Sequence, residues 1–245
     1  MRWFIVGLAA ASAVLVATAG QVHGGITLGG AVDDRVNLQT ALDDLGESYT
    51  PGSEYPDPTG LGAGDIIIIG MDGGTGPYQD YTTFLNAGGD LICAGGSNWD
   101  PYRAWIAGYF NITDTASGWH TDGDWHKSSD HIANTYLPDD YTFETVGHTY
   151  HMLGFLATPN TTILGYNDEG IDIAAIREYN NGGTFNYMAL DLGWRPGDQD
   201  AFITPWLHGA LDAAREVVIP EPSTFLVWSL LAALGIGTAA YRRKR

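Results

Sequence analysis

Four consecutive isoleucines, Ile66 to Ile69, constrain the fold of this chain more than any other feature. They lie between Asp65 and Gly70 and do not alternate with polar residues. A strand of this kind is buried on both faces, which is typical of a parallel sheet covered by helices on both sides. We therefore expect an α/β domain built around this strand.

Strand-like and helix-like segments alternate on either side of this run. Gly and Pro residues separate them, and the stretch from Thr50 to Gly64 is expected to be a long loop. The expected strands are 26–28, 66–69, 90–93, 150–156, 161–165 and 184–190, and the expected helices are 34–46, 78–87, 99–110 and 201–217. We expect Asp34 to be the N-cap of the first helix, Gly46 its C-cap, Gly95–Gly96 a turn, and 111–143 an irregular polar loop layer. This order requires crossover connections and predicts three layers around a mostly parallel, flavodoxin-like sheet.

The N-terminal segment has the pattern of a secretory signal peptide. A charged start at Arg2 is followed by an apolar run from Trp3 to Val16 and by the small residues Ala17-Thr18-Ala19. The apolar run, about 14 residues, is shorter than the roughly 20 that a membrane span requires. We expect residues 1–19 to be removed after export through the Sec translocon.

The C-terminal segment combines a short motif, an apolar stretch and a basic tail. The motif is Pro220-Glu221-Pro222-Ser223, and its two prolines keep this stretch extended and accessible. No charge occurs from Thr224 to Ala240, and the chain ends with four basic residues at 242–245. We expect a transmembrane helix over 224–241 whose basic end stays in the cytoplasm.

This C-terminal order resembles the PEP-CTERM sorting signal of Gram-negative bacteria, with Pro220, Glu221, Pro222 and Ser223 as the sorting motif. The resemblance covers residues 219–245. It implies that a membrane-embedded exosortase reads the signal, and that the protein is held transiently in the inner membrane before it reaches the cell envelope, the outer surface or the extracellular matrix. A plain tail anchor is the alternative, and it leaves the expected location almost unchanged.

The segment between the two ends, residues 20–218, is expected to be one acidic domain. Five of the 11 basic residues and one of the 29 acidic residues lie in the end segments, which leaves 6 bases, 28 acids and a net charge of −22. Such a charge repels phosphate backbones, so nucleic acid is excluded as a partner, whereas an extracellular polysaccharide remains possible. Cys93 is the only cysteine, so no intramolecular disulfide can form.

The domain also resembles the class I glutamine amidotransferase-like superfamily, including its trehalose-utilisation-protein-like relatives. The resemblance is carried by four segments, namely 66–69, 81–92, 131–138 and 194–197. It implies an amidotransferase-like sheet and a nucleophilic cysteine on a G-x-C-x-G elbow, assisted by a His-Pro-Glu segment. Cys93 is the candidate nucleophile, but residue 91 is Leu where the elbow has Gly, and Arg195-Pro196-Gly197 stands where His and Glu are expected. The catalytic set is therefore incomplete, and Cys93 can equally be a buried strand residue.

Two further groups of residues are candidates for chemistry. His120, Asp124 and His126 belong to a polar segment that can bind a divalent metal, with His126 as a possible general base. Their spacing matches no dedicated metal motif, so hydrogen-bonding loop residues are the alternative, and we expect no cofactor. Asp72, Asn98 and Trp99 follow predicted strands at the edge where α/β folds bind ligands, and they can line a cleft for a neutral sugar or form Gly-rich turns.

Our leading hypothesis is an exported, exosortase-sorted surface protein whose amidotransferase-like domain is non-catalytic and serves a structural or binding role. Two alternatives remain. One is a secreted hydrolase that acts on a glycan or an amide, and the other is a saccharide-binding module.

Overall fold

A computed structural model describes residues 24–72, 78–96, 100–111, 120–121, 124–143, 148–149, 160–190 and 196–216. The strands are β1 Ile26–Gly30, β2 Tyr49–Pro51, β3 Ile66–Asp72, β4 Asp90–Gly96, β5 His120–Thr121, β6 Trp125–Lys127, β7 Asp140–Tyr141, β8 His148–Thr149, β9 Thr161–Tyr166, β10 Asp172–Glu178 and β11 Thr184–Met188. The α-helices are α2 Val32–Asp44, α3 Thr82–Asn86, α4 Asp100–Phe110 and α5 Thr204–Arg215, with a 3₁₀ turn at Ile132–Asn134.

The core of the domain is a nine-stranded sheet with the order β2-β1-β3-β4-β11-β10-β9-β6-β7. The first five strands are parallel to one another. From β11 onward every pairing is antiparallel. The fold is therefore mixed α/β and compatible with the expected amidotransferase-like arrangement, but the prediction of a mostly parallel sheet is correct for only one half.

The antiparallel half depends on β10, a strand that is not among those expected from the sequence. Short connections, 167–171 and 179–183, join β10 to its neighbours β9 and β11. Connections of this length allow only antiparallel hairpins, since a parallel crossover needs a dozen or more residues.

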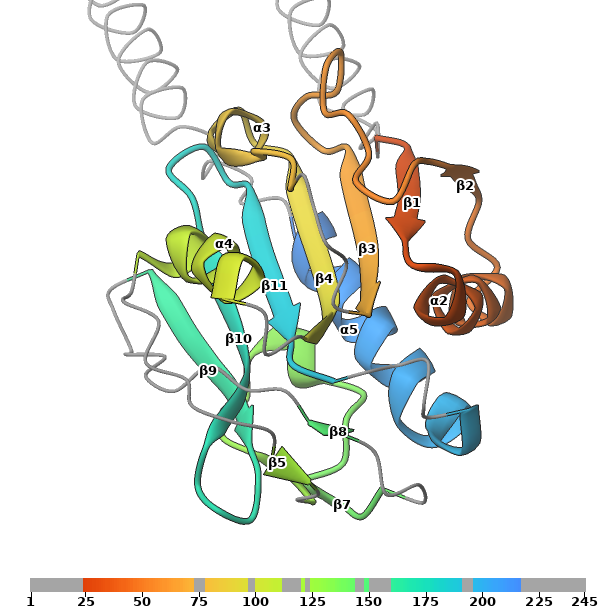
Figure 1. The fold of residues 1–245 in the computed structure, drawn as a ribbon, viewed down its shortest axis with the longest axis vertical. Helices are drawn as coiled ribbons and strands as arrows, with labels where there is room; N and C mark the ends of the chain where they lie inside the picture. The colour runs from red at the N-terminus through yellow and green to blue at the C-terminus, as the bar shows by residue number, and fades with distance from the viewer. Residues whose placement is uncertain are drawn as a thin grey trace, which may run out of the picture. The chain divides into compact units, whose positions relative to one another are not determined.

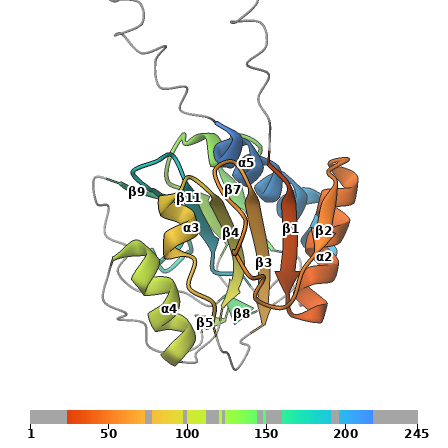
Figure 2. The ribbon, with the colours of Figure 1, turned by 90° about the horizontal axis from the view of Figure 1, so that it is seen from above.

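Helices cover both faces of the sheet (Figures 1 and 2). On one face α2 and α5 pack together, and on the other α3 and α4 lie over β4 and β11. Ring contacts from Tyr109 and Phe110 of α4 to Phe185 of β11, with centroids 5.0 Å apart in both cases, fix the second face. The predicted layering of helix, sheet and helix is thus present over the parallel half.

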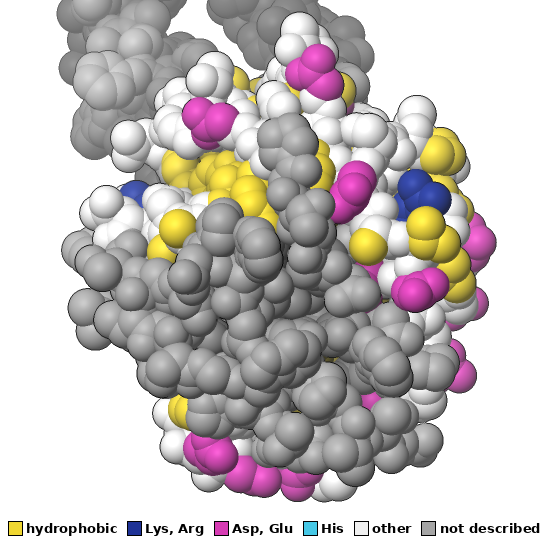
Figure 3. Space-filling view, viewed as in Figure 1, with side chains coloured by type: hydrophobic (Ala, Val, Ile, Leu, Met, Phe, Trp, Pro, Cys, Tyr) yellow, Lys and Arg dark blue, Asp and Glu magenta, His cyan; other side chains and the backbone are white. Residues whose placement is uncertain are grey.

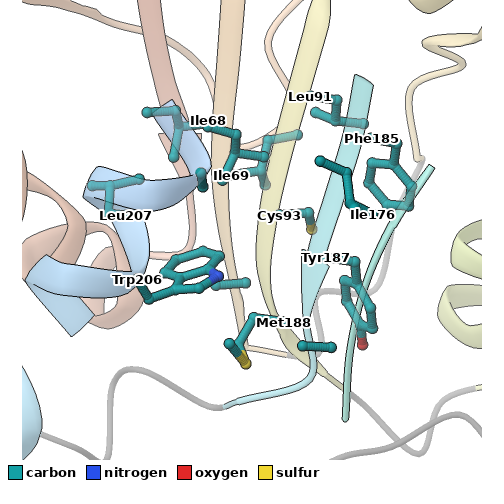
Figure 4. Close-up of a cluster of buried hydrophobic side chains, with 14 of the residues drawn as sticks. Ile68, Ile69, Leu91, Cys93, Ile176, Phe185, Tyr187, Met188, Trp206 and Leu207 are labelled. Carbon is teal, nitrogen blue, oxygen red and sulfur yellow. The ribbon is translucent and has the colours of Figure 1, made fainter. Parts of the chain in front are cut away.

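The isoleucine run lies in β3, an interior strand of the parallel half, and is buried as predicted. Its four side chains are at most 2% exposed. Figure 4 shows Ile68 on the side of the sheet that faces Trp206 and Leu207 of α5, whereas Cys93 and Tyr187 point to the opposite side. Burial on both faces explains why the isoleucine run has no polar positions.

Several predicted boundaries are wrong for local reasons. Helix α2 begins at Val32 with Ala31 at the N-cap, so Asp34 lies in its first turn, fully buried, instead of capping it. Gly46 follows the helix with a φ of 71°, which agrees with a helix end there. Gly95 and Gly96 do not turn but extend β4, because they pair with Met71 and Asp72 of β3.

The segment 78–81 is not helical, and α3 begins only at Thr82. The backbone N–H of Thr82 donates to Oδ1 of Asp80 at 2.8 Å, which closes a turn that competes with helix at this point. The segment 111–143 is not wholly irregular either, since it contains β5, β6, β7 and the 3₁₀ turn.

The predicted strand 150–156 lies outside the described residues, as do the signal peptide, the sorting motif and the 224–241 helix. Within the described ranges, no helix is long and apolar enough to cross a membrane.

Candidate functional site

Cys93 lies in the interior of the sheet. It is the fourth residue of β4 and pairs with Ile69 on one side and Tyr187 on the other. Its side chain is fully buried, and three further strand residues follow before β4 ends. Cys93 is therefore not on a strand-to-helix elbow, and no substrate can reach its sulfur without opening the core.

His126 stands between two carboxylates at the end of the antiparallel half. Its Nδ1 lies 2.7 Å from Oδ1 of Asp140, and its Nε2 lies 2.7 Å from Oδ1 of Asp168. The ring stacks on Tyr166 with centroids 5.2 Å apart. Hydrogen bonds to Asp140 and then to Asp168 raise the pKa of His126, because both stabilise the imidazolium. With both nitrogens engaged, the ring has no free atom for general base catalysis.

Asp124 belongs to the same cluster. Its backbone N–H donates to Oδ2 of Asp168 at 3.3 Å, and its own Oδ2 accepts from the Thr142 hydroxyl at 2.8 Å. The backbone of His120 lies in β5, which pairs with β8 outside the main sheet. In the part of the chain that the structure describes, no three His, Cys, Asp or Glu side chains are placed to hold a metal ion.

Asp72 ends β3 at the expected edge of the sheet, where it pairs with Gly96. Asn98 and Trp99, its predicted partners in a sugar cleft, lie outside the described residues. This part of the predicted site therefore stays a prediction.

A different surface forms a groove that the sequence did not reveal. It runs between α3 and α4 toward the end of β10, and we call it the α3–α4 groove. Two cavities, of about 290 Å³ and 220 Å³, lie next to each other in it, and Thr82 and Gly108 line both. Figure 3 shows hydrophobic side chains gathered at the surface between α3 and α4. The first cavity is lined by Tyr78, Asp80, Thr82, Ala104, Trp105, Gly108 and Tyr109, and the second by Thr82, Asn86, Gly108, Asn111, Asn160, Arg177, Glu178, Tyr179 and Asn180.

The first cavity has an aromatic wall. Tyr78 and Trp105 stack with centroids 5.3 Å apart and an interplanar angle of 20°. The indole Nε1 of Trp105 donates to the carbonyl oxygen of Gln79 at 2.8 Å, and the Tyr109 hydroxyl donates to the same oxygen at 3.3 Å. The Tyr81 N–H donates to that hydroxyl at 3.0 Å. These bonds fix the 78–81 loop against α4, so the aromatic wall is preformed.

The second cavity is polar and is built around the end of α4. The carbonyl oxygen of Tyr109 accepts from Nη1 of Arg177 at 2.5 Å and from the Tyr179 hydroxyl at 2.8 Å. The Arg177 guanidinium also lies 5.1 Å from the centroid of the Tyr179 ring. Asn111 then takes a φ of 55°, which ends the helix. Exposed amides surround this point, at Asn86, Asn111, Asn160 and Asn180.

The shifted ionisable groups of the groove keep their ordinary charges near neutral pH. Burial raises the pKa of Tyr179 to about 12, and it also raises the pKa of Tyr109, so both remain neutral. The hydrogen bonds from Thr82 lower the pKa of Asp80, which therefore remains a carboxylate. Among the described residues, the lining includes no histidine, cysteine or serine. An aromatic wall beside polar groups of this kind suits ligand binding.

No protein-family model matches this chain, and no curated protein sequence does. Solved structures similar to this chain include two of low sequence identity. One is the crystal structure of Agd3, a novel carbohydrate deacetylase, with 15% identity and a TM-score of 0.46 over 75% of this chain and 32% of that chain. The other is a putative GMP synthase subunit from Thermoplasma acidophilum, with 10% identity and a TM-score of 0.45 over 78% of this chain and 94% of that chain. Neither likeness extends to a site or an activity.

Proposed function

We propose that the α/β domain binds a saccharide in the α3–α4 groove. The observation that carries this proposal is the direct continuation of the aromatic wall into an amide-lined cavity, joined at Thr82 and Gly108. A sugar ring has C–H faces that pack on aromatic side chains and hydroxyls at its rim that need donors and acceptors. The Tyr78–Trp105 wall supplies the first kind of surface and the four asparagine amides supply the second.

The size of the groove agrees with this ligand class. Together, the volumes of the two cavities fall within the range of about 300–1,000 Å³ that is typical of ligand sites. Each cavity alone is smaller than that. A ligand that fills both must extend beyond one sugar ring, so an oligosaccharide is favoured over a monosaccharide. The preformed aromatic wall lowers the entropic cost of binding, because its side chains are already fixed by hydrogen bonds to Gln79 and Tyr81.

We further propose that the domain performs this role outside the cell. The signal-peptide pattern of residues 1–19 and the motif Pro220-Glu221-Pro222-Ser223 support export and exosortase sorting. The test is the intact mass of the protein recovered from its native envelope or medium. Loss of residues 1–19 together with a cut near the motif is the expected result, and a retained C-terminal helix contradicts sorting.

Two substitutions test the groove. Trp105→Ala removes half of the aromatic wall, and ring packing of this kind typically contributes on the order of 1 kcal/mol, so binding should weaken about fivefold. Gly108→Leu places a side chain where the two cavities meet, and a Cβ at this helical position has no atom within 4 Å. The fold therefore tolerates the change while the groove is blocked.

The assay is a glycan array followed by calorimetric titration of the best-binding neutral oligosaccharide. We expect wild-type binding, weaker binding by Trp105→Ala and none by Gly108→Leu. Gly25→Leu serves as the matched control, because Gly25 is exposed outside the groove and a Cβ there also has no atom within 4 Å. Equal binding by wild type and Gly108→Leu would refute the proposed site, and no binding to any glycan would refute the proposed function.

A further inference from the structure

The exposed charges of the α3–α4 groove identify the class of saccharide more closely. Among the described residues, three charged side chains line it, namely Asp80, Arg177 and Glu178. Asp80 and Glu178 are exposed, whereas Arg177 is partly buried. The groove therefore presents its carboxylates to solvent and its cation to the protein.

Arg177 is committed to the fold. Its Nη1 donates to the carbonyl oxygen of Tyr109, and its guanidinium lies against the Tyr179 ring. Its Nε is buried without a hydrogen-bond partner among the described residues. The end of the helix and the Tyr179 ring hold this cation close to the negative end of α4.

Asp80 lines the first cavity, and Glu178 lines the second. Burial is the main cause of the raised pKa of Tyr109 and of Tyr179, and the negative charge of Asp80 adds to both. The hydrogen bond from the Thr82 N–H holds the Asp80 carboxylate at this position.

From this arrangement we propose that the groove selects saccharides that carry a free ammonium group, such as 2-amino-2-deoxy sugars, over neutral and acidic ones. This inference rests on the proposed saccharide function. The ring packs on the Tyr78–Trp105 wall, and the ammonium group pairs with Asp80 and, in a longer ligand, with Glu178. The net charge of −22 outside the end segments adds a field that attracts cationic chains and repels uronic acids.

The test compares three probes at low and moderate salt: a β-linked glucosamine tetramer, its fully N-acetylated counterpart and a galacturonate tetramer. We expect the glucosamine tetramer to bind about tenfold more tightly than the N-acetylated one at low salt, because exposed ion pairs are weak and two of them are available. This advantage should shrink as salt screens the charges. The galacturonate tetramer should bind least.

Matched variants locate the effect. The double variant Asp80→Asn/Glu178→Gln should lose the preference for glucosamine, measured as the ratio of the dissociation constants of the two tetramers. The control, Asp43→Asn/Asp44→Asn, removes the same charge from exposed positions of α2, on the opposite face of the sheet, and should keep most of the preference.

The outcomes separate this inference from the function on which it rests. Equal binding of the glucosamine and N-acetylated tetramers overturns the selectivity and leaves saccharide binding intact. Equal loss of preference in both double variants shows a general charge effect and also overturns it. No binding of any of the three tetramers, together with no binding on a glycan array, removes the proposed function itself.

Discussion

Asp90 is a buried carboxyl group whose ionisation should oppose folding. It begins β4, is 1% exposed, and its Oδ1 accepts from the N–H and the hydroxyl of Thr184, at 2.8 Å in both cases. Burial raises the pKa of Asp90 to about 7, although the two bonds from Thr184 act in the opposite direction. Asp90→Asn keeps an oxygen that can accept both bonds and removes the charge.

The sign and size of the effect follow from the two pKa values. The folded-state pKa, about 7, is above the ordinary value of 3.8, so the folded state holds its proton more tightly. Ionisation of Asp90 in the unfolded state therefore lowers stability progressively from about pH 4 to pH 7, and the loss is complete above pH 7. At about 1.4 kcal/mol per pKa unit, the full loss is at most about 4 kcal/mol.

The assay is urea denaturation of wild type and Asp90→Asn between pH 4 and pH 8.5. The difference between the two proteins isolates this group, because the other carboxylates titrate in both. We expect nearly equal stability at pH 4 and a variant that is more stable by up to about 4 kcal/mol at pH 8. A variant less stable than wild type at pH 8 would show that the hydrogen bonds from Thr184 outweigh desolvation, and it would refute the reasoning.

Four further substitutions test other features of the fold. Asn186→Leu should raise the free energy of unfolding by about 1–2 kcal/mol in urea denaturation, because both polar side-chain atoms of Asn186 are buried without a hydrogen-bond partner among the described residues; a large loss would contradict this. His126→Gln should lower stability at pH 5 more than at pH 8.5, because the pKa of His126 is raised in the folded state. Its ion pairs with Asp140 and Asp168 stabilise the fold below the unfolded-state pKa and are lost as the pH rises through the folded-state pKa. A stability difference that does not depend on pH would contradict this. Gly209→Ala should lower the free energy of unfolding by about 1–3 kcal/mol, because its Cβ would lie 2.3 Å from the Ala133 carbonyl oxygen. Gly108→Ala should be neutral or stabilising by up to about 1 kcal/mol, because a Cβ there has no atom within 4 Å. A lower melting temperature for Gly108→Ala than for Gly209→Ala would contradict this packing.

The fold was predictable where one local pattern decides the structure. Ile66 to Ile69 have no alternative to a strand buried on both faces, and the parallel half of the sheet follows from it. The antiparallel half was not predictable in the same way. The β10 sequence, Asp172 to Glu178, has two central alanines and acidic ends, and its burial comes from its neighbours β9 and β11 instead of from its own hydrophobicity.

The candidate site was predictable only as a kind of chemistry. An abundance of aromatic residues favours a sugar ligand, and an acidic charge leaves a neutral one possible. The predicted cleft at Asp72, Asn98 and Trp99 stays a prediction, and the α3–α4 groove was not predicted because it joins segments that are distant in the chain. Tyr78 meets Trp105 from a loop, and Arg177 reaches the end of α4 from β10. Only the sheet order, which places β11 beside β4 and β10 beside β11, brings these segments together.

The indole resonances of ¹⁵N-tryptophan-labelled protein report directly on saccharide binding in the α3–α4 groove. Trp105→Phe assigns the Trp105 signal, and the probe is the best-binding oligosaccharide from the array. Because the Trp105 ring forms the wall and its Nε1 is fixed to Gln79, we predict that this signal shifts on titration with the same dissociation constant that calorimetry gives. An unchanged Trp105 signal at saturating saccharide would contradict the account.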